Sequence, residues 1–207
     1  MLVVLTAFVM VAVTYAFWQE GLQTACCTCV NVVLAGLVAF CLFEPLADAL
    51  DGAWQTTFLS GYEDCLSLVL IFAVVLGGLR LATNSIAPTN LEYPGLLLRA
   101  GGVLFGLLTG YLVAGFLLCA VQTLPLPEHF LLFEAKVAPG GAEGLRRVLP
   151  PDRVWLAMMH RAGLGPFARG DDPTFDPRGN FELRYARYRR LDEHGKQRKY
   201  DGAAPAK

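Results

Sequence analysis

The chain has 207 residues, of which 55% are hydrophobic and 17% are charged, and its mean hydropathy is +0.45. The formal net charge of −1 conceals an uneven distribution, because only Arg80 and Arg99 among the 17 lysines and arginines precede residue 124. A soluble domain carries charged residues throughout. The composition therefore argues against a soluble domain over this first part and indicates a membrane domain followed by a polar tail.

Four apolar stretches are long enough for the hydrocarbon layer of a bilayer, which a helix crosses with roughly 20 residues. They cover residues 2–18, 22–43, 65–83 and 100–124. The third contains one charged residue, Arg80, which is close enough to its end to reach the interface. We therefore predict an all-α, polytopic membrane protein with four transmembrane helices in a membrane domain over residues 1–127. A polar C-terminal extramembrane tail, with short helices and disorder, follows over residues 128–207.

The connections between the stretches predict how the helices are arranged. No basic residue precedes the first stretch as in a cleaved signal peptide, so we expect it to be retained as a helix. Only residues 19–21 separate it from the second, which predicts a tight antiparallel hairpin. The connection 44–64 has five acidic residues, no Lys or Arg, and the aromatic residues Trp54 and Phe58, so we expect a short interfacial helix in it. Turn residues at 88–90 form the third link.

Small residues recur at every fourth position of the fourth stretch, at Gly102, Gly106, Gly110 and Ala114. Glycine costs about 1 kcal/mol relative to alanine inside a helix, so this series needs a structural reason. Lipid tails are as apolar as leucine, and membrane helices associate instead by close packing at small residues. The series predicts a helix-packing face, whose partner is either another helix of the same chain or a second copy in a homo-oligomer.

These features resemble the colicin V production protein (CvpA) family over roughly residues 1–125. The resemblance is carried by the tight turn FWQEG, by GGLRLA at the end of the third stretch, and above all by LLLRAGGVLFGLLTGYLVAG in the fourth. The turn differs from the family pattern in having Gln19 and Glu20 where arginine is common. The resemblance implies a multi-pass protein of the bacterial inner (cytoplasmic) membrane that supports toxin production or export, or envelope homeostasis more broadly.

The residue pattern offers no recognisable catalytic or metal-binding chemistry. The six cysteines all lie in or beside apolar stretches, and the three histidines are scattered through the tail without a nearby ligand. The sequence contains no nucleophile elbow, phosphate-binding loop or dinucleotide fingerprint. We therefore expect a protein that is not an enzyme and that has no cofactor and no metal site.

Polar residues at membrane depth are candidates for function. Asn31 lies well inside the second stretch, where it could also serve simply to hydrogen-bond across helices. Glu20, Arg80 and Arg99 lie at or near the ends of stretches and are expected at the interface. A coupled transporter would carry charged groups deeper in the membrane, so this set argues against one while leaving open a passive pore formed by oligomerisation.

The tail contains two segments of interest. Residues 152–165 predict a short amphipathic helix, and residues 178–199 contain eight basic and three acidic residues. If the second segment is helical, Arg184, Arg187 and Arg190 share one face. That basic face could lie on anionic lipid or bind an acidic protein, and a solvated, partly disordered tail is the alternative. No nucleic-acid partner is expected.

Besides the family role, two functions of other classes stay open. One is a passive channel or small-solute transporter, which needs a water-accessible path lined by polar groups. The other is a membrane-anchored scaffold that acts through its basic tail. Solute flux into liposomes would favour the first, and capture of a partner by the tail would favour the second.

Four spans would put both termini and the 44–64 connection on one side of the membrane. Short loops determine orientation, and Arg80 and Arg99 flank the short third link, so we predict a cytoplasmic third link and both termini outside. An alkaline phosphatase fused after Lys207 should then be active, and a green fluorescent protein fused there should be dark. The opposite pattern would put the termini in the cytoplasm, as the basic residues just beyond the fourth stretch favour.

Overall fold

A computed structural model of the chain describes residues 2–20, 22–54, 62–86, 95–124 and 151–163, together with Phe181. The regular structure of these residues is entirely helical, as the sequence predicts. The helices are α1 (Leu2–Glu20), α2 (Leu22–Trp54), α3 (Glu63–Ile86), α4 (Gly95–Gln122) and α6 (Pro151–Gly163). Three of them, α2, α3 and α4, are long and apolar enough to cross a membrane, whereas the apolar part of α1 that is described covers only Val4–Trp18. The number of spans stays a prediction.

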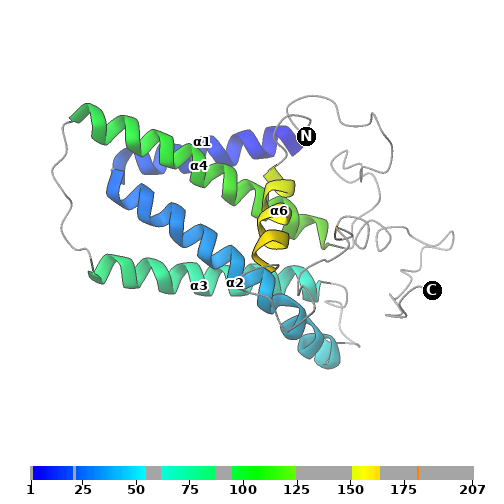
Figure 1. Ribbon diagram of the computed structural model, residues 1–207. Coiled ribbons are helices and arrows are strands. Elements are labelled where there is room, and N and C mark those ends of the chain that lie inside the picture. Colours follow the sequence, from blue (N-terminus) through cyan, green and yellow to red (C-terminus); the bar gives the residue numbers. More distant parts are fainter. Residues whose placement is uncertain are drawn as a thin grey trace.

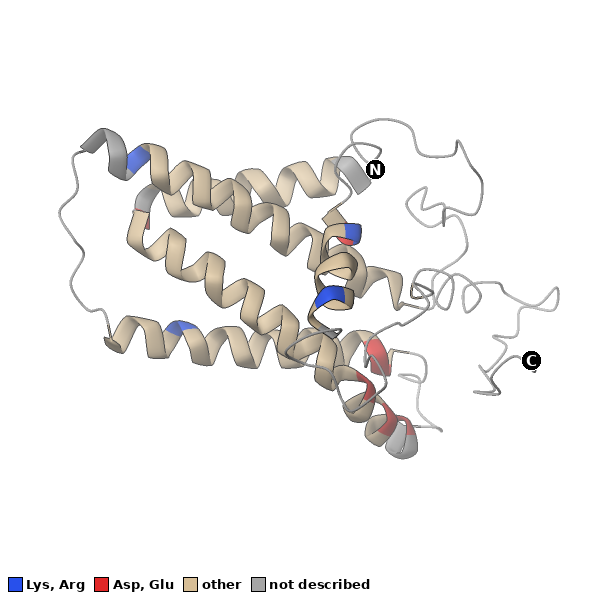
Figure 2. Cartoon of the chain, in the orientation of Figure 1, with Lys and Arg blue, Asp and Glu red and all other residues tan. Residues whose placement is uncertain are grey.

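The long helices form two antiparallel pairs (Figure 1). α1 lies along α4, α2 lies along α3, and contact between α2 and α4 joins the pairs. At one end of the bundle, called the hairpin end here, α1 meets α2, α3 ends and α4 begins. α6 lies at the opposite end, called the α6 end. The described charged residues gather toward these two ends and leave the ribbon between them uncharged (Figure 2), as a hydrocarbon layer requires.

The small-residue face of α4 packs on α1. A Cβ atom built on Gly110 would lie 2.8 Å from the Met10 Cα atom, and one built on Gly106 would lie 3.0 Å from the Thr14 Cα atom. Real Cβ atoms essentially never come closer than 3.0 Å, and a 3.0 Å contact is already tighter than nine in ten of them. The two helices can therefore meet at this distance because Gly110 has no Cβ atom to collide with α1 and Gly106 has none to crowd it. Gly102 and Ala114, which continue the series, are also buried.

From the sequence, the partner of the small-residue face could be a helix of the same chain or a second copy of the protein, and the packing on α1 answers this question. Gly106 and Gly110 are covered by a helix of the same chain. A homo-oligomer formed through α4 would therefore use another face of that helix, where Leu104 and Leu108 are exposed. Such an oligomer stays a prediction.

α2 extends beyond the apolar stretch that predicts it. The helix does not end at Phe43 but continues through Pro45 to Trp54, so residues 44–54 of the connection continue α2 rather than form a separate helix, and residues 63–64 begin α3. Its 33 residues make a helix about 50 Å long, whereas the hydrocarbon layer is about 30 Å thick. The last turns of α2, which are rich in acidic residues, therefore extend past the apolar layer.

Aromatic rings fill the space where α2, α3 and α4 meet. Phe72 of α3 stacks on Phe116 of α4 with ring centroids 3.9 Å apart, and Phe40 of α2 meets Phe116 edge to face at 5.8 Å. Phe40, Phe43 and Phe116 are each at most 2% exposed. These rings hold the two helix pairs together toward the α6 end of the bundle.

α6 completes this core from the tail. The Trp155 side chain is fully buried, and it occupies a notch where a Cβ atom on either Gly36 of α2 or Gly115 of α4 would collide with α6. The indole N–H donates a hydrogen bond to the Leu112 carbonyl. From the sequence, this helix is predicted to be amphipathic and to belong to an extramembrane tail. In the structure, its apolar face is part of the bundle core.

Replacing Gly106 by leucine should force α1 and α4 apart, because the added side chain would press on the α1 backbone at Thr14. Overpacking of this kind destabilises a protein by about 1–3 kcal/mol. Reversible unfolding in detergent micelles would measure the change in the free energy of unfolding.

The matched control is Gly77→Leu, because a Cβ atom on Gly77 of α3 has no neighbour within 4 Å. Leu107→Ala, at an exposed position of α4, provides a second control that removes a side chain instead of adding one. If Gly106→Leu and Gly77→Leu unfold alike, α1 does not pack on this face of α4.

Candidate functional site

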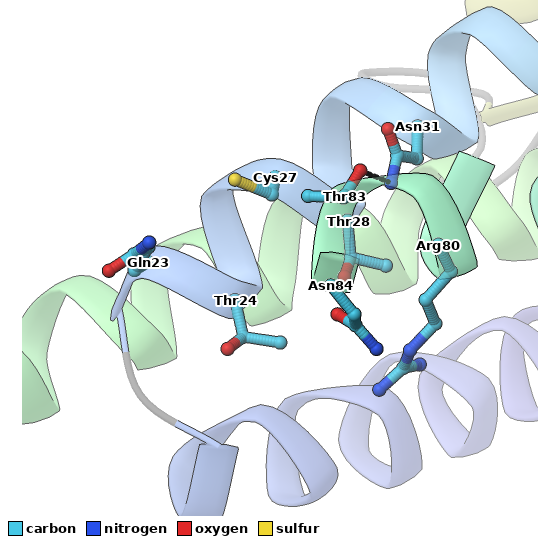
Figure 3. Close-up of a pocket in the computed structure, with 8 residues that line it drawn as sticks. All are labelled: Gln23, Thr24, Cys27, Thr28, Asn31, Arg80, Thr83 and Asn84. Carbon is cyan, nitrogen blue, oxygen red and sulfur yellow. Dashed lines mark hydrogen bonds between the residues drawn. The ribbon is translucent and has the colours of Figure 1, made fainter. Parts of the chain in front are cut away.

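A row of polar side chains lies between α2 and α3 near the hairpin end, and we call it the polar seam (Figure 3). On α2, positions 24, 28 and 31 recur at helical spacing and so share one face, and on α3 positions 80, 83 and 84 do the same. The two faces meet across a cavity of about 20 Å³. It is lined by Gln23, Thr24, Cys27, Thr28, Asn31, Arg80, Thr83 and Asn84.

The deepest part of the seam is a hydrogen bond between the two helices. Asn31 Nδ2 donates to Thr83 Oγ1 at 3.0 Å, and the Thr83 hydroxyl donates to the Leu79 carbonyl of its own helix at 2.7 Å. Asn31 is only 7% exposed. A buried amide within a membrane span needs a partner, because an unsatisfied polar group there is costly. The contact therefore sets the relative position of α2 and α3 at this depth.

An ion pair links α1 to Arg80 in the lining of the seam. Arg80 Nη2 lies 2.9 Å from both carboxylate oxygens of Glu20, at the end of α1. The two side chains are 44% and 37% exposed, so solvent weakens the attraction, and such a pair contributes about 0–1 kcal/mol. Its effect is mainly geometric, since it ties the end of α1 to α3.

The size and chemistry of the cavity limit what the seam can do. A volume of about 20 Å³ holds about one ordered water molecule. Hydroxyl, amide and guanidinium groups can hold water or a small polar solute, and among the lining residues there is no histidine or carboxylate to act as a general base. Within the described ranges, no group of three or more His, Cys, Asp or Glu side chains could hold a metal ion.

The structure brings together three of the polar residues that the sequence singles out. Asn31 and Arg80 line the seam and Glu20 pairs with Arg80, whereas Arg99, exposed near the start of α4, is at the same end of the bundle but not in the lining. The basic tail residues Arg184, Arg187 and Arg190 lie outside the described residues.

The other lining residues are not among the candidates predicted from the sequence, and three of them are threonines. Thr24 and Thr28 stand four residues apart and Asn31 three further on, which is the spacing of one helix face. Thr83 and Asn84 follow Arg80 in the same way. These periodic polar positions in otherwise apolar helices were the available signal.

A second buried polar contact joins α6 to α4 at the other end of the bundle. Asp152 is fully buried, and its Oδ2 accepts a hydrogen bond from Gln122 Nε2 at 2.9 Å. The Cys119 thiol donates to the Asp152 carbonyl at 3.7 Å. Pro151 and Asp152 suit the first turn of a helix, where no internal N–H bond is lost and a negative charge faces the positive helix end. This contact fixes where α6 begins.

A comparison with known protein families gives a match that covers all four long helices, α1 to α4. The family model described as Colicin V production protein matches residues 2–144. The chain belongs to the colicin V production protein family. No curated protein and no solved structure matches it.

Family membership and the apolar helices together make the chain a multi-pass membrane protein of the colicin V production family. The matched region contains the polar seam, the Glu20–Arg80 pair and the glycine face of α4. It ends at residue 144, before α6 begins at Pro151. The core of this family member is thus completed by a helix outside the matched region.

Breaking the Asn31–Thr83 hydrogen bond should destabilise the α2–α3 pair. In a double-mutant cycle of Asn31→Ala and Thr83→Ala, we expect a coupling energy of about 0.6 kcal/mol and at most about 1.7 kcal/mol, the mean and the maximum measured for such bonds between helices in lipid. Unfolding in bicelles would supply the four free energies of unfolding.

A cycle of Asn31→Ala with Ser85→Ala is the control, because the Ser85 hydroxyl bonds only within α3, to the Ala82 carbonyl. Those two substitutions should be additive. Equal coupling in both cycles would mean that the Asn31–Thr83 bond does not link the helices.

Proposed function

We propose that this protein is a four-span protein of the bacterial inner membrane that supports toxin production or export, or envelope homeostasis more broadly, without catalysing a reaction. The family match over residues 2–144 carries this proposal, because it covers α1 to α4 in full. The fourth span would be α1, whose 19 residues make a helix about 28 Å long, close to the thickness of the hydrocarbon layer.

The geometry supports a structural role in the membrane better than transport. Helix pairs that meet at backbone distance, as α1 and α4 do, leave no room between them for a solute. The polar seam is small, and beyond Asn31 α2 continues into the bundle with buried Val32, Ala35 and Ala39. The polar path ends against apolar side chains, so it does not cross the bundle. This supports a bundle that organises other proteins or the bilayer more than a bundle that conducts a solute.

A second candidate, a passive path for water or a small solute, is favoured by one observation. The seam lines up hydroxyl and amide groups on two facing membrane helices near the hairpin end. Such a path would need the apolar part of the bundle beyond Asn31 to open, either by movement of α3 or in an oligomer. Asn31 would then be its narrowest polar point.

Deletion of the gene in a toxin-producing host tests the proposed role. Loss of the protein should reduce toxin production or export, or raise sensitivity to envelope stress, and the wild-type chain should restore the phenotype. Gly110→Leu, which crowds the α1 backbone, should fail to restore it, whereas Gly78→Leu, placed in open space on α3, should succeed. An unaltered phenotype in the deletion strain would refute the proposed role.

Asn31→Leu separates the two candidate functions. This substitution removes the central polar group of the seam and its hydrogen bond to Thr83 while keeping a side chain of similar size. Loss of that bond lowers the stability by only about 0.6 kcal/mol, so under the structural role the variant should still restore the phenotype. If the Asn31→Leu variant is present in the membrane at the wild-type amount and still does not restore the phenotype, the passive path is favoured. Glycerol uptake by proteoliposomes would then have to exceed that of empty liposomes and to fall with Asn31→Leu.

A further inference from the structure

The part of α2 that extends past the apolar layer carries a ridge of negative charge. Glu44, Asp48 and Asp51 are spaced four and three residues apart, so they share one face of the helix, and all three are exposed. The ridge is about 10 Å long. Figure 2 shows acidic residues gathered here, at the end of α2, and at the start of α3. We call the three residues the acidic ridge.

One tail residue is held at the base of this ridge. Phe181 is only 4% exposed and belongs to the same apolar cluster as Phe40 and Phe43. Its ring meets that of Phe40 nearly edge to face, with centroids 6.2 Å apart and an interplanar angle of 70°. Phe40 stands one helical turn before Glu44. Phe181 therefore lies near the first residue of the acidic ridge.

The sequence after Phe181 has the opposite charge. Residues 182–199 contain seven basic and three acidic residues, and the first arginine, Arg184, comes three positions after Phe181. Three residues reach at most about 10 Å, the length of the ridge itself. The basic segment can therefore meet the ridge without any rearrangement of the bundle.

We propose that the acidic ridge of α2 is the docking surface for the basic segment 182–199 of the same chain, positioned by Phe181 against Phe40. The opposite charges attract, and the anchor raises the effective concentration of the segment at the ridge. An anionic lipid surface is a poorer partner at this place, because the ridge repels it.

The docking is weak and reversible, because the charges of the ridge are exposed to solvent. Exposed charge pairs are individually weak and are screened by salt over about 8–10 Å at physiological ionic strength. The segment is therefore held by several weak contacts and one aromatic anchor. It can be displaced by salt, or by a basic partner that competes for the ridge.

Hydrogen exchange of the full chain in nanodiscs of neutral lipid tests the proposal. At low salt, amides of residues 182–199 should exchange about two- to fivefold more slowly than in about 0.5 M salt, as expected for weak, screened contacts. Asp48→Lys with Asp51→Lys should raise exchange at low salt to the high-salt rate. Adding Arg184→Glu, Arg187→Glu, Arg189→Glu and Arg190→Glu to that variant should restore slow exchange, because the segment then has three basic and seven acidic residues and its charge is reversed to match the reversed ridge.

Glu20→Lys is the control, because it reverses an acidic charge at the hairpin end and leaves the ridge intact; it should not change exchange of the tail. Exchange in α1 and α4 reports whether each variant keeps its fold. The proposal is overturned if the segment exchanges equally in wild type and ridge variant. It is also overturned if slow exchange appears only with anionic lipid and survives reversal of the ridge, which would make the bilayer the partner.

Discussion

Two helix backbones in direct contact determine how the rest of this bundle is assembled. At Gly106 and Gly110 the surface of α4 is bare backbone, and α1 lies on it at Thr14 and Met10. Between helices in lipid there is little hydrophobic gain, so close packing of this kind must supply the association energy. With α1 held there, an adjoining side of α4, which carries Phe116, is left to meet α2, and α2 in turn contacts α3. The polar seam and the aromatic core both depend on that order of helices.

Much of this could be predicted from the sequence, because the membrane imposes strong local constraints. Apolar length predicts where α3 and α4 lie, and the four-residue spacing of Gly102, Gly106, Gly110 and Ala114 indicates a packing face. The extent of α2 could not be predicted in the same way. Proline and acidic residues after Phe43 are typical of a connection, yet the helix continues through Pro45 to Trp54 because the residues beyond are compatible with a helix.

The candidate site was predictable only in part, for a different reason. Asn31, Arg80 and Glu20 stand out in an apolar sequence as polar residues, but threonine does not, since it is common in membrane helices. That Thr83 faces Asn31 depends on the rotation of α3 about its axis, and no local pattern specifies that rotation. The burial of Trp155 is still less predictable, because the notch for it combines Gly36 and Gly115 from two helices far apart in the chain.

The notch at Gly36 and Gly115 also has a consequence for synthesis. Trp155 is made after all the long helices, so the growing chain enters the bilayer with the notch unfilled. Assembly therefore has two stages, insertion of the long helices followed by docking of α6 into the notch. A ribosome that stops near residue 144 would release a protein with every apolar helix and an open gap in its core. Quality control that recognises such gaps would distinguish it from the finished chain.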